Sequence, residues 1–281
     1  MGLDTGRYLL RIGWPVGELI APDIQSLRRL QHFHCCNIPF ENLDVLFERT
    51  IGVDKDALIR KLIEAGRGGY CYELNGLFYQ ALQAFGFQVT SLAARVLISR
   101  PQAMPARTHQ LLRVILNEDA WLVDVGFGGQ TPCEPLLLQA DIIQTTRCGS
   151  WRLSQNQDGW LLSVLDRNKW APLYQFDEQQ QYLSDFQMAN HYVATWPTSH
   201  FRHHLLASRY TLEGGQYRLL NYRLTKQLAS GETHVCTLPN HIALWRCLQD
   251  IFKINVTSSQ YGIASDELGR VMTHLLSSGT R

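Results

Sequence analysis

The sequence predicts an α+β protein, in which a helical first third is followed by an antiparallel β middle third and a mixed last third. Apolar residues recur at helical spacing from Ile24 to Phe33 and again from Leu58 to Ala65. From Phe87 to Asp185 they form short alternating or continuous runs between Asn, Asp, Gly and Pro, which is typical of strands. We therefore expect a helical domain at residues 1–86, a β domain at 87–190 and an α/β domain at 191–281.

A loop separates the two expected helices of the first domain. It runs from Asn37 to Val45 and contains Pro39, which cannot continue a helix. The loop can place Glu41 and Asn42 near a site. In the β domain the expected strands are Ser91–Ser99, Leu111–Leu116, Trp121–Val125 and Trp160–Val164. In the last domain we expect a strand pair at Tyr217–Leu224 and His234–Leu238 and a helix at Ile242–Phe252.

Charge and hydropathy exclude several classes of partner. The 26 Lys and Arg residues nearly balance the 25 Asp and Glu residues, and the basic residues are scattered. Nucleic acids and anionic membranes are recognised by basic patches, so we expect neither as a partner. Residues 1–14 lack the apolar run of a signal peptide, and no later run approaches the length of a membrane span. We expect a cytoplasmic protein.

The seven cysteines predict reduced thiols and no metal. Their number is odd, and they are spread along a long chain that shows no signal peptide. Cys35 and Cys36 are adjacent, and no second pair has metal-ligand spacing, so we expect no structural zinc. His200, His203 and His204 lack the glutamate of a zinc-hydrolase helix, and we expect them to be surface or packing residues.

The segment from Arg67 to Asn75, with sequence RGGYCYELN, precedes an apolar helical face that ends at Gly86. Its two consecutive glycines permit a close backbone approach and leave Cys71 in the first helical turn. Unpaired N–H groups and the positive end of the helix dipole stabilise a thiolate there. The alternative is that Cys71 is a small buried apolar residue.

Thiolate catalysis also needs a base and a group that orients the base. His109 begins an apolar run, and Asp124 lies inside another, where burial of a carboxylate is costly unless it is paired. Asp124 could instead bind backbone N–H groups at a strand end. A tight turn at Glu118–Asp119 would place Asp124 opposite Arg113, four residues from His109. Pairing with His109 therefore requires a staggered register, a bulge, or strands that do not form a simple hairpin.

A glycine-rich loop follows Asp124, from Gly126 to Gly129. Such a loop can present backbone N–H groups to a phosphate, although it can equally be a plain turn.

These motifs resemble those of the arylamine N-acetyltransferase family in order and spacing, and most closely its enterobacterial-type members. The resemblance covers most of the chain. It rests on Ile38–Asp44, Arg67–Asn75, Thr108–His109, Asp124–Gly128 and Ser199–Arg202.

The resemblance implies a papain-like cysteine core with a helical N-terminal domain, a β-barrel-like middle domain and a mixed α/β C-terminal lid. By position, Cys71 is the nucleophile, His109 the base and Asp124 the orienting residue. The resemblance also implies that Glu41 and Arg67 form a structural ion pair. Gly126, Phe127, Gly128 and Gly129 would contact acetyl-CoA, and Tyr72, Phe127 and Phe201 would line the aryl pocket.

The function implied is acetyl transfer from acetyl-CoA to arylamines, aryl hydrazines or N-hydroxyarylamines by a ping-pong mechanism through acetyl-Cys71, without a metal. Two alternatives use the same residues differently. A papain-like hydrolase would use the same triad on water, and a non-catalytic binding domain would bury Cys71 as a packing residue.

Overall fold

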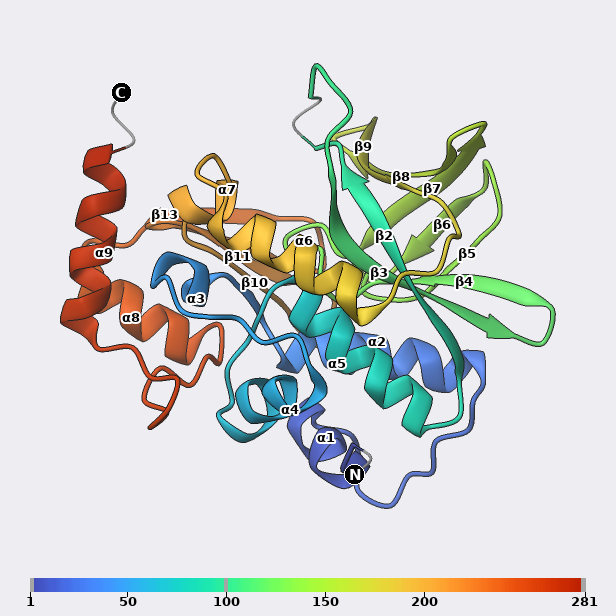
Figure 1. The fold of residues 1–281 in the computed structure, drawn as a ribbon, viewed down its shortest axis with the longest axis horizontal. Coiled ribbons are helices and arrows are strands. Elements are labelled where there is room, and N and C mark those ends of the chain that lie inside the picture. Colours follow the sequence, from blue (N-terminus) through green and yellow to red (C-terminus); the bar gives the residue numbers. More distant parts are fainter. Residues whose placement is uncertain (1–2, 99–100, 279–281) are drawn as a thin grey trace.

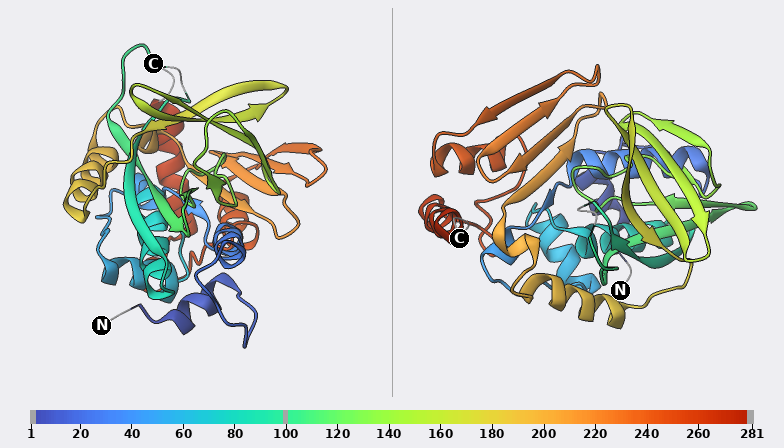
Figure 2. Two further views of the ribbon diagram at one scale, coloured as in Figure 1. Left: turned by 90° about the vertical axis from the view of Figure 1, so that its right-hand side faces the viewer. Right: turned by 90° about the horizontal axis from the view of Figure 1, so that it is seen from above.

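A computed structural model of the chain describes residues 3–98 and 101–278. Two antiparallel sheets lie side by side, and helices pack against both of them (Figures 1 and 2). The predicted α+β class is confirmed. The strand expected from Ser91 to Ser99 ends earlier, at Val96, and Ser99 itself lies outside the described residues.

The first part of the chain is helical, as predicted. Asp23 begins the long second helix, because its side chain accepts a hydrogen bond from the Ser26 backbone N–H at 2.8 Å. The helices here are α1 (Thr5–Ile12), α2 (Ile24–Asn37), α3 (Leu43–Leu46), α4 (Lys55–Leu58), the π-helical turn η1 (Ile59–Glu64) and α5 (Cys71–Ala84).

The larger sheet has eight strands in the order β5-β4-β3-β2-β9-β8-β7-β6 and is barrel-like. Its two edge strands are joined by Gln144, whose side-chain amide exchanges two hydrogen bonds with the backbone of Leu137, at 2.7 and 2.8 Å. The strands are β2 (Gln88–Val96), β3 (Arg107–Leu116), β4 (Asp119–Val123), β5 (Leu136–Leu137), β6 (Ile143–Thr146), β7 (Gly149–Asn156), β8 (Gly159–Asp166) and β9 (Lys169–Phe176).

The smaller sheet combines one strand from the first third of the chain with four strands from the last third. Phe40 and Glu41, expected in a loop, form the short strand β1 (Phe40–Glu41), which pairs with β10. The other strands are β10 (Leu206–Tyr210), β11 (Gln216–Leu220), β12 (Arg223–Gln227) and β13 (Thr233–Thr237). The helices that accompany them are α6 (Leu183–Thr195), α7 (His200–His203), α8 (His241–Asp250) and α9 (Ser265–Ser278).

One detail of the last third differs from the expectation. The strand predicted from Tyr217 to Leu224 contains the hairpin turn between β11 and β12, where Asn221 adopts a left-handed conformation. Asn is one of the few residues that tolerate that conformation, but the apolar residues on both sides of Asn221 gave no indication of a turn. The expected domain boundaries stay predictions. The first, at residue 86, follows α5, whereas α6 runs through the second, at residue 190.

The state of two cysteines differs from the prediction. Cys133 and Cys148 form a disulfide with their Cα atoms 6.1 Å apart, whereas the other five cysteines are free. The prediction of seven reduced thiols was wrong because it rested on number and context. The fold brings the loop between β4 and β5, which carries Cys133, beside the turn between β6 and β7, which carries Cys148.

Among the described residues, no helix has the length and apolar character needed to cross a membrane.

Candidate active site

Cys71 is the first residue of α5 and is 4% exposed. Gly68 and Gly69 precede it where the chain passes close to other atoms. A Cβ on Gly68 would lie 2.2 Å from the Pro39 carbonyl oxygen, and one on Gly69 would lie 2.6 Å from the Glu73 carboxylate. Neither glycine has a positive φ, so close approach is the reason for glycine at these positions.

Glu73 holds the start of α5. Its Oε2 accepts a hydrogen bond from the Tyr70 backbone N–H at 3.1 Å, and its Oε1 accepts one from Lys61 Nζ at 2.6 Å. Burial raises the pKa of Glu73 to about 7, although the positive charge of Lys61 opposes that shift. The carboxylate nearest to Cys71 in sequence is therefore engaged in the helix cap.

His109 lies in β3, and Asp124 directly follows β4. His109 Nε2 donates to Asp124 Oδ2 at 2.8 Å, and both side chains are buried. The hairpin register pairs Leu112 with Val123, so the next position, Leu111, lies opposite Asp124. The register expected from a turn at Glu118–Asp119 was wrong, because the turn falls one residue earlier and includes Asn117 with a positive φ.

The Asp124 carboxylate accepts four hydrogen bonds in total. Tyr174 donates from its hydroxyl group to Oδ2 at 3.0 Å, which is the oxygen that also binds His109. Asn75 Nδ2 donates to Oδ1 at 2.9 Å, and the Gly126 backbone N–H donates to the same oxygen at 2.8 Å. The buried charge is thus fully hydrogen-bonded, as burial of a carboxylate requires.

The environment of His109 favours its charged form. Burial alone would lower the pKa of His109, because it removes water from the imidazolium. The negative charge of Asp124 and the hydrogen bonds of the ring with Asp124 and Cys71 outweigh burial and raise the pKa to about 10. Because Asp124 occupies Nε2, Nδ1 is the ring nitrogen left for the Cys71 thiol.

Arg67 and Glu41 form the expected ion pair. Arg67 Nη2 lies 2.7 Å from Glu41 Oε1, and both side chains are completely buried. Arg67 also contacts Asp44 at 3.2 Å, and Lys61 Nζ joins Asp44 and Glu73 at 2.7 and 2.6 Å. This charged cluster lies beneath the start of α5 and holds it against β1.

A cavity of about 660 Å³ opens above Cys71 and His109. The glycine-rich loop from Gly126 to Gly129 forms one wall, and Arg218 and Arg223 of the smaller sheet contribute positive charge to the other. Gly126 must be glycine, since a Cβ there would lie 2.8 Å from the Cys71 Cα. The cavity is therefore large enough for an extended ligand that ends at the thiol.

The three predicted aromatic residues are divided between two cavities. Phe127 and Phe201 line the 660 Å³ cavity. Phe127 also contacts the His109 ring edge-on, with the ring centroids 4.9 Å apart. Tyr72 instead lines a second cavity of about 310 Å³, which it shares with Thr108, His109 and Phe186. Its hydroxyl group is buried and has no hydrogen-bond partner among residues 3–98 and 101–278.

The papain-like α+β fold brings a cysteine, a histidine and an aspartate together at one cavity, as in the class of papain-like enzymes. Residues 23–261 match the N-acetyltransferase family. The chain belongs to the arylamine N-acetyltransferases, a family of acetyl-transferring enzymes.

Individual relatives agree with this assignment. The chain is 43% identical to an arylamine N-acetyltransferase of Escherichia coli over 95% of this chain and 94% of that protein. It is similar in structure to the arylamine N-acetyltransferase of Salmonella typhimurium, with a TM-score of 0.93, 42% identity and coverage of 98% and 99%. The Mycobacterium marinum enzyme in complex with CoA gives a TM-score of 0.90 at 34% identity, with coverage of 97% and 99%.

Sequence reasoning missed three residues that hold Asp124. Asn75 lies one helical turn after Cys71 on the same face of α5, and a buried amide at that spacing was an available signal. Gln31 of α2 donates to the Asp124 backbone carbonyl oxygen at 3.1 Å, and Tyr174 belongs to β9. Neither has a sequence pattern that connects it to Asp124.

Proposed function

We propose that the protein transfers an acetyl group from acetyl-CoA to arylamines, aryl hydrazines or N-hydroxyarylamines by a ping-pong mechanism through acetyl-Cys71. The observation that carries the proposal is the 2.8 Å hydrogen bond from His109 to Asp124, next to a cysteine that begins a helix and opens onto a cavity. In this proposal His109 is the base and Asp124 the orienting residue.

The first half-reaction uses the imidazolium form of His109. Asp124 holds the positive charge on His109, and that charge stabilises the Cys71 thiolate. The thiolate attacks the thioester carbonyl carbon, and unpaired N–H groups of the first turn of α5 stabilise the oxyanion. The C–S bond to CoA then breaks, and CoA thiolate takes the proton from His109. Acetyl-Cys71 and neutral His109 remain.

The second half-reaction reverses the proton movements. The acceptor amine attacks the acetyl carbon of acetyl-Cys71, and neutral His109 removes the proton that the amine loses. The C–S bond to Cys71 breaks, and the thiolate–imidazolium pair is restored. The enzyme is regenerated without a metal or redox step.

The cavity supports binding of acetyl-CoA with its thioester at Cys71. Gly126, Phe127, Gly128 and Gly129 form a loop that can approach phosphate oxygens closely. Arg218 lies against this loop, since its Cδ would be 3.1 Å from a Cβ on Gly129. Arg223 lines the same cavity from the next strand, so the two guanidinium groups can bind the phosphates of CoA.

Phe127 and Phe201 support an aromatic acceptor. Both line the cavity that holds Cys71, and an aryl ring stacked between them would gain about 0.5–1.5 kcal/mol beyond area burial. Tyr72, the third residue of the proposed aryl pocket, contributes from the adjoining cavity beside His109.

The intact mass of the protein after incubation with acetyl-CoA alone tests the proposal. We expect one acetyl group, located on Cys71 by peptide mapping and removed when an arylamine is added. Cys71→Ser should not be labelled. Label on another cysteine, or release of CoA without any acetyl-protein when deacetylation by water is slow, would contradict the relay through Cys71.

A further inference from the structure

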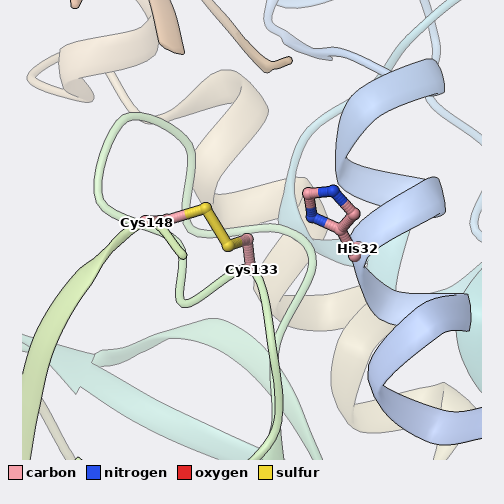
Figure 3. A group of neighbouring side chains, drawn as sticks. All are labelled: His32, Cys133 and Cys148. Carbon is pink, nitrogen blue, oxygen red and sulfur yellow. A yellow bond between two sulfur atoms is a disulfide. The ribbon is translucent and has the colours of Figure 1, made fainter. Parts of the chain in front are cut away.

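A second group of reactive side chains lies where α2 meets the two segments that the disulfide joins. Among the described residues, His32, Cys133 and Cys148 form the one group of three potential metal ligands whose donor atoms all lie within 4.8 Å of one another. Figure 3 shows His32 projecting from α2 toward the disulfide that joins the two cysteines. In the disulfide state both sulfur atoms are bonded to each other and are poor ligands.

We propose that His32, Cys133 and Cys148 form a binding site for Zn²⁺ when the disulfide is reduced. A dithiol reductant supplies two electrons and two protons, so the S–S bond becomes two thiols and the reductant becomes its own disulfide. Zn²⁺ then replaces the two thiol protons, which are released to solvent, and His32 donates a ring-nitrogen lone pair. Water occupies the fourth position, since Cys148 is only half-buried.

His32 already has the features of a metal-binding imidazole. It is 4% exposed, and its Nε2 lies 3.2 Å from the Leu212 carbonyl oxygen, to which it can donate. That hydrogen bond fixes the tautomer with the proton on Nε2. The lone pair of Nδ1, which the Cys36 sulfur approaches to 3.9 Å, is then the one that a metal would take, the usual arrangement of histidine ligands.

The two cysteine segments are held together by contacts other than the disulfide. Glu134 and Arg147, each adjacent to one of the cysteines, form an ion pair at 2.9 Å. Gln31 Nε2 donates at 2.5 Å to the carbonyl oxygen of Pro132, the residue before Cys133. Reduction therefore leaves both thiols facing His32. The sulfur atoms need to separate only to roughly 3.8 Å, the spacing that Zn–S bonds of ~2.3 Å give in a tetrahedral site.

Cys36 carries another sulfur atom close to His32, but it is not included in the site. Its Sγ lies 3.8 Å from His32 Nε2. The donor atoms that all lie within 4.8 Å of one another belong to His32, Cys133 and Cys148, and this group does not include Cys36.

The site would replace one cross-link by another at the same place. Zinc would join α2 to the loop after β4 and to the turn between β6 and β7, the two segments that the disulfide joins. The same loop carries Gly126 to Gly129, and Gln31 connects it to the backbone of Asp124. The candidate active site thus keeps its support in both oxidising and reducing surroundings.

The test compares the full-length protein before and after reduction by a phosphine. Co²⁺ serves as the probe, because thiolate ligation gives charge-transfer absorption and a tetrahedral site gives visible d–d bands. We expect the reduced protein to bind one equivalent of Co²⁺ with these absorption bands, and Zn²⁺ to displace the bound Co²⁺. The oxidised protein should show no such bands. Cys133→Ser and His32→Gln should each weaken uptake by more than roughly 10-fold, the least that loss of even an outer partner costs.

Cys236→Ser is the matched control, because Cys236 is an exposed free cysteine that could bind cobalt adventitiously. It should leave the uptake unchanged. Alkylation mapping gives a measurement that needs no variant, since Zn²⁺ should protect Cys133 and Cys148 of the reduced wild-type protein from iodoacetamide. Equal cobalt spectra before and after reduction, loss of the spectrum in Cys236→Ser, or zinc protection confined to other cysteines would each overturn the proposal.

Discussion

The Nε2 atom of His109 lies 2.8 Å from Oδ2 of Asp124, although the hairpin register puts Leu111, not His109, opposite Asp124. An offset of two residues keeps His109 and Leu111 on the same face of β3. Asp124 has left the ladder, since β4 ends at Val123, so its side chain can reach diagonally to the imidazole. The contact thus depends on where β4 ends as well as on its register.

Asp124→Asn tests the orienting role. The amide preserves the shape of the side chain, but it has no negative charge with which to accept the hydrogen bond from His109. The equivalent change lowers the rate by about 10⁴ in a serine protease triad. We expect the rate of acetylation of Cys71 by acetyl-CoA to fall by several orders of magnitude, measured in single-turnover mode. The circular dichroism spectrum should be unchanged.

Tyr174→Phe is the graded control for that variant. It removes one neutral hydrogen bond to the same oxygen of Asp124 and leaves the charge in place. We expect a much smaller loss of rate than in Asp124→Asn. Equal losses in the two variants would mean that the carboxylate acts only as a structural acceptor.

The raised pKa of His109 predicts a pH dependence of stability. The folded protein holds the His109 proton up to pH about 10, whereas an unfolded histidine releases it near 6.5. The stabilisation is therefore complete below about pH 6.5 and is lost as pH rises through about 10. Between these values the His109 proton, taken by itself, lowers the free energy of unfolding by about 1.4 kcal/mol for each unit by which the pH rises.

Urea unfolding of Cys71→Ser and of Cys71→Ser combined with His109→Gln measures that contribution, because without the thiol no second proton offsets the one that His109 holds. The two curves of unfolding free energy against pH should converge as pH rises above 6.5, because only the variant that keeps His109 loses a proton-linked term. Parallel curves would show that His109 is neutral in the folded protein.

How far the sequence predicts the site can be judged from particular residues. The position of Cys71 at a helix start is local information, because two glycines and an apolar helical face fix it. The residue that Asp124 contacts cannot be predicted from local sequence. A hairpin turn that starts one residue earlier, at Asn117, shifts the pairing of the two strands by two residues. Tyr174 and Gln31 reach Asp124 from 50 and 93 residues away, and nothing in the sequence indicates their contacts.

The same distinction explains the error in the cysteines. Each of Cys133 and Cys148 lies in an irregular segment, and their proximity comes from the curvature of the eight-stranded sheet. Composition and spacing carry no signal for curvature. The predicted ion pair of Glu41 and Arg67 was obtained only through family resemblance, for the same reason.

That ion pair predicts a large effect on stability. Glu41→Gln would leave Arg67 completely buried with its closest counter-ion removed, and breaking a buried pair typically costs about 3–5 kcal/mol. The contacts of Arg67 with Asp44 should keep the loss toward the lower end. Glu64→Gln is the control, since its pair with Arg7 is half exposed and such pairs contribute about 0–1 kcal/mol. Similar losses of unfolding free energy in both variants would refute the argument.

Phe127→Leu tests the aromatic slot while preserving most of the apolar volume. Loss of stacking worth about 0.5–1.5 kcal/mol should raise KM for anilines and aryl hydrazines roughly 2- to 10-fold. Aliphatic amines of matched basicity should be affected little. Because Phe127 also contacts His109, the acetylation half-reaction must be measured separately, and a loss confined to that step would place Phe127 with the base and not in the slot.

Arg223→Ala tests the proposed phosphate contact. Arg223 and Thr225 of β12 line the 660 Å³ cavity. Successive side chains of a strand point to opposite faces, so Lys226, which follows Thr225, lies on the other face, over the Tyr217 ring. Lys226→Ala therefore removes the same charge from the same strand without touching the cavity. We expect Arg223→Ala to raise KM for acetyl-CoA roughly 10-fold, as loss of a charge-assisted hydrogen bond worth about 1.5 kcal/mol would.

The identity of the acyl donor distinguishes phosphate binding from a general effect on the cavity. A short thioester such as an acetylated N-acetylcysteamine lacks the phosphates of CoA, so its KM should be the same in wild type and Arg223→Ala. Rising salt should weaken acetyl-CoA binding in wild type more than in Arg223→Ala, since the screened interaction is absent from the variant. If Lys226→Ala raised KM as much as Arg223→Ala, or if both donors were affected equally, the phosphate contact would have to be assigned to other residues, with Arg218 beside Gly129 as the first to examine.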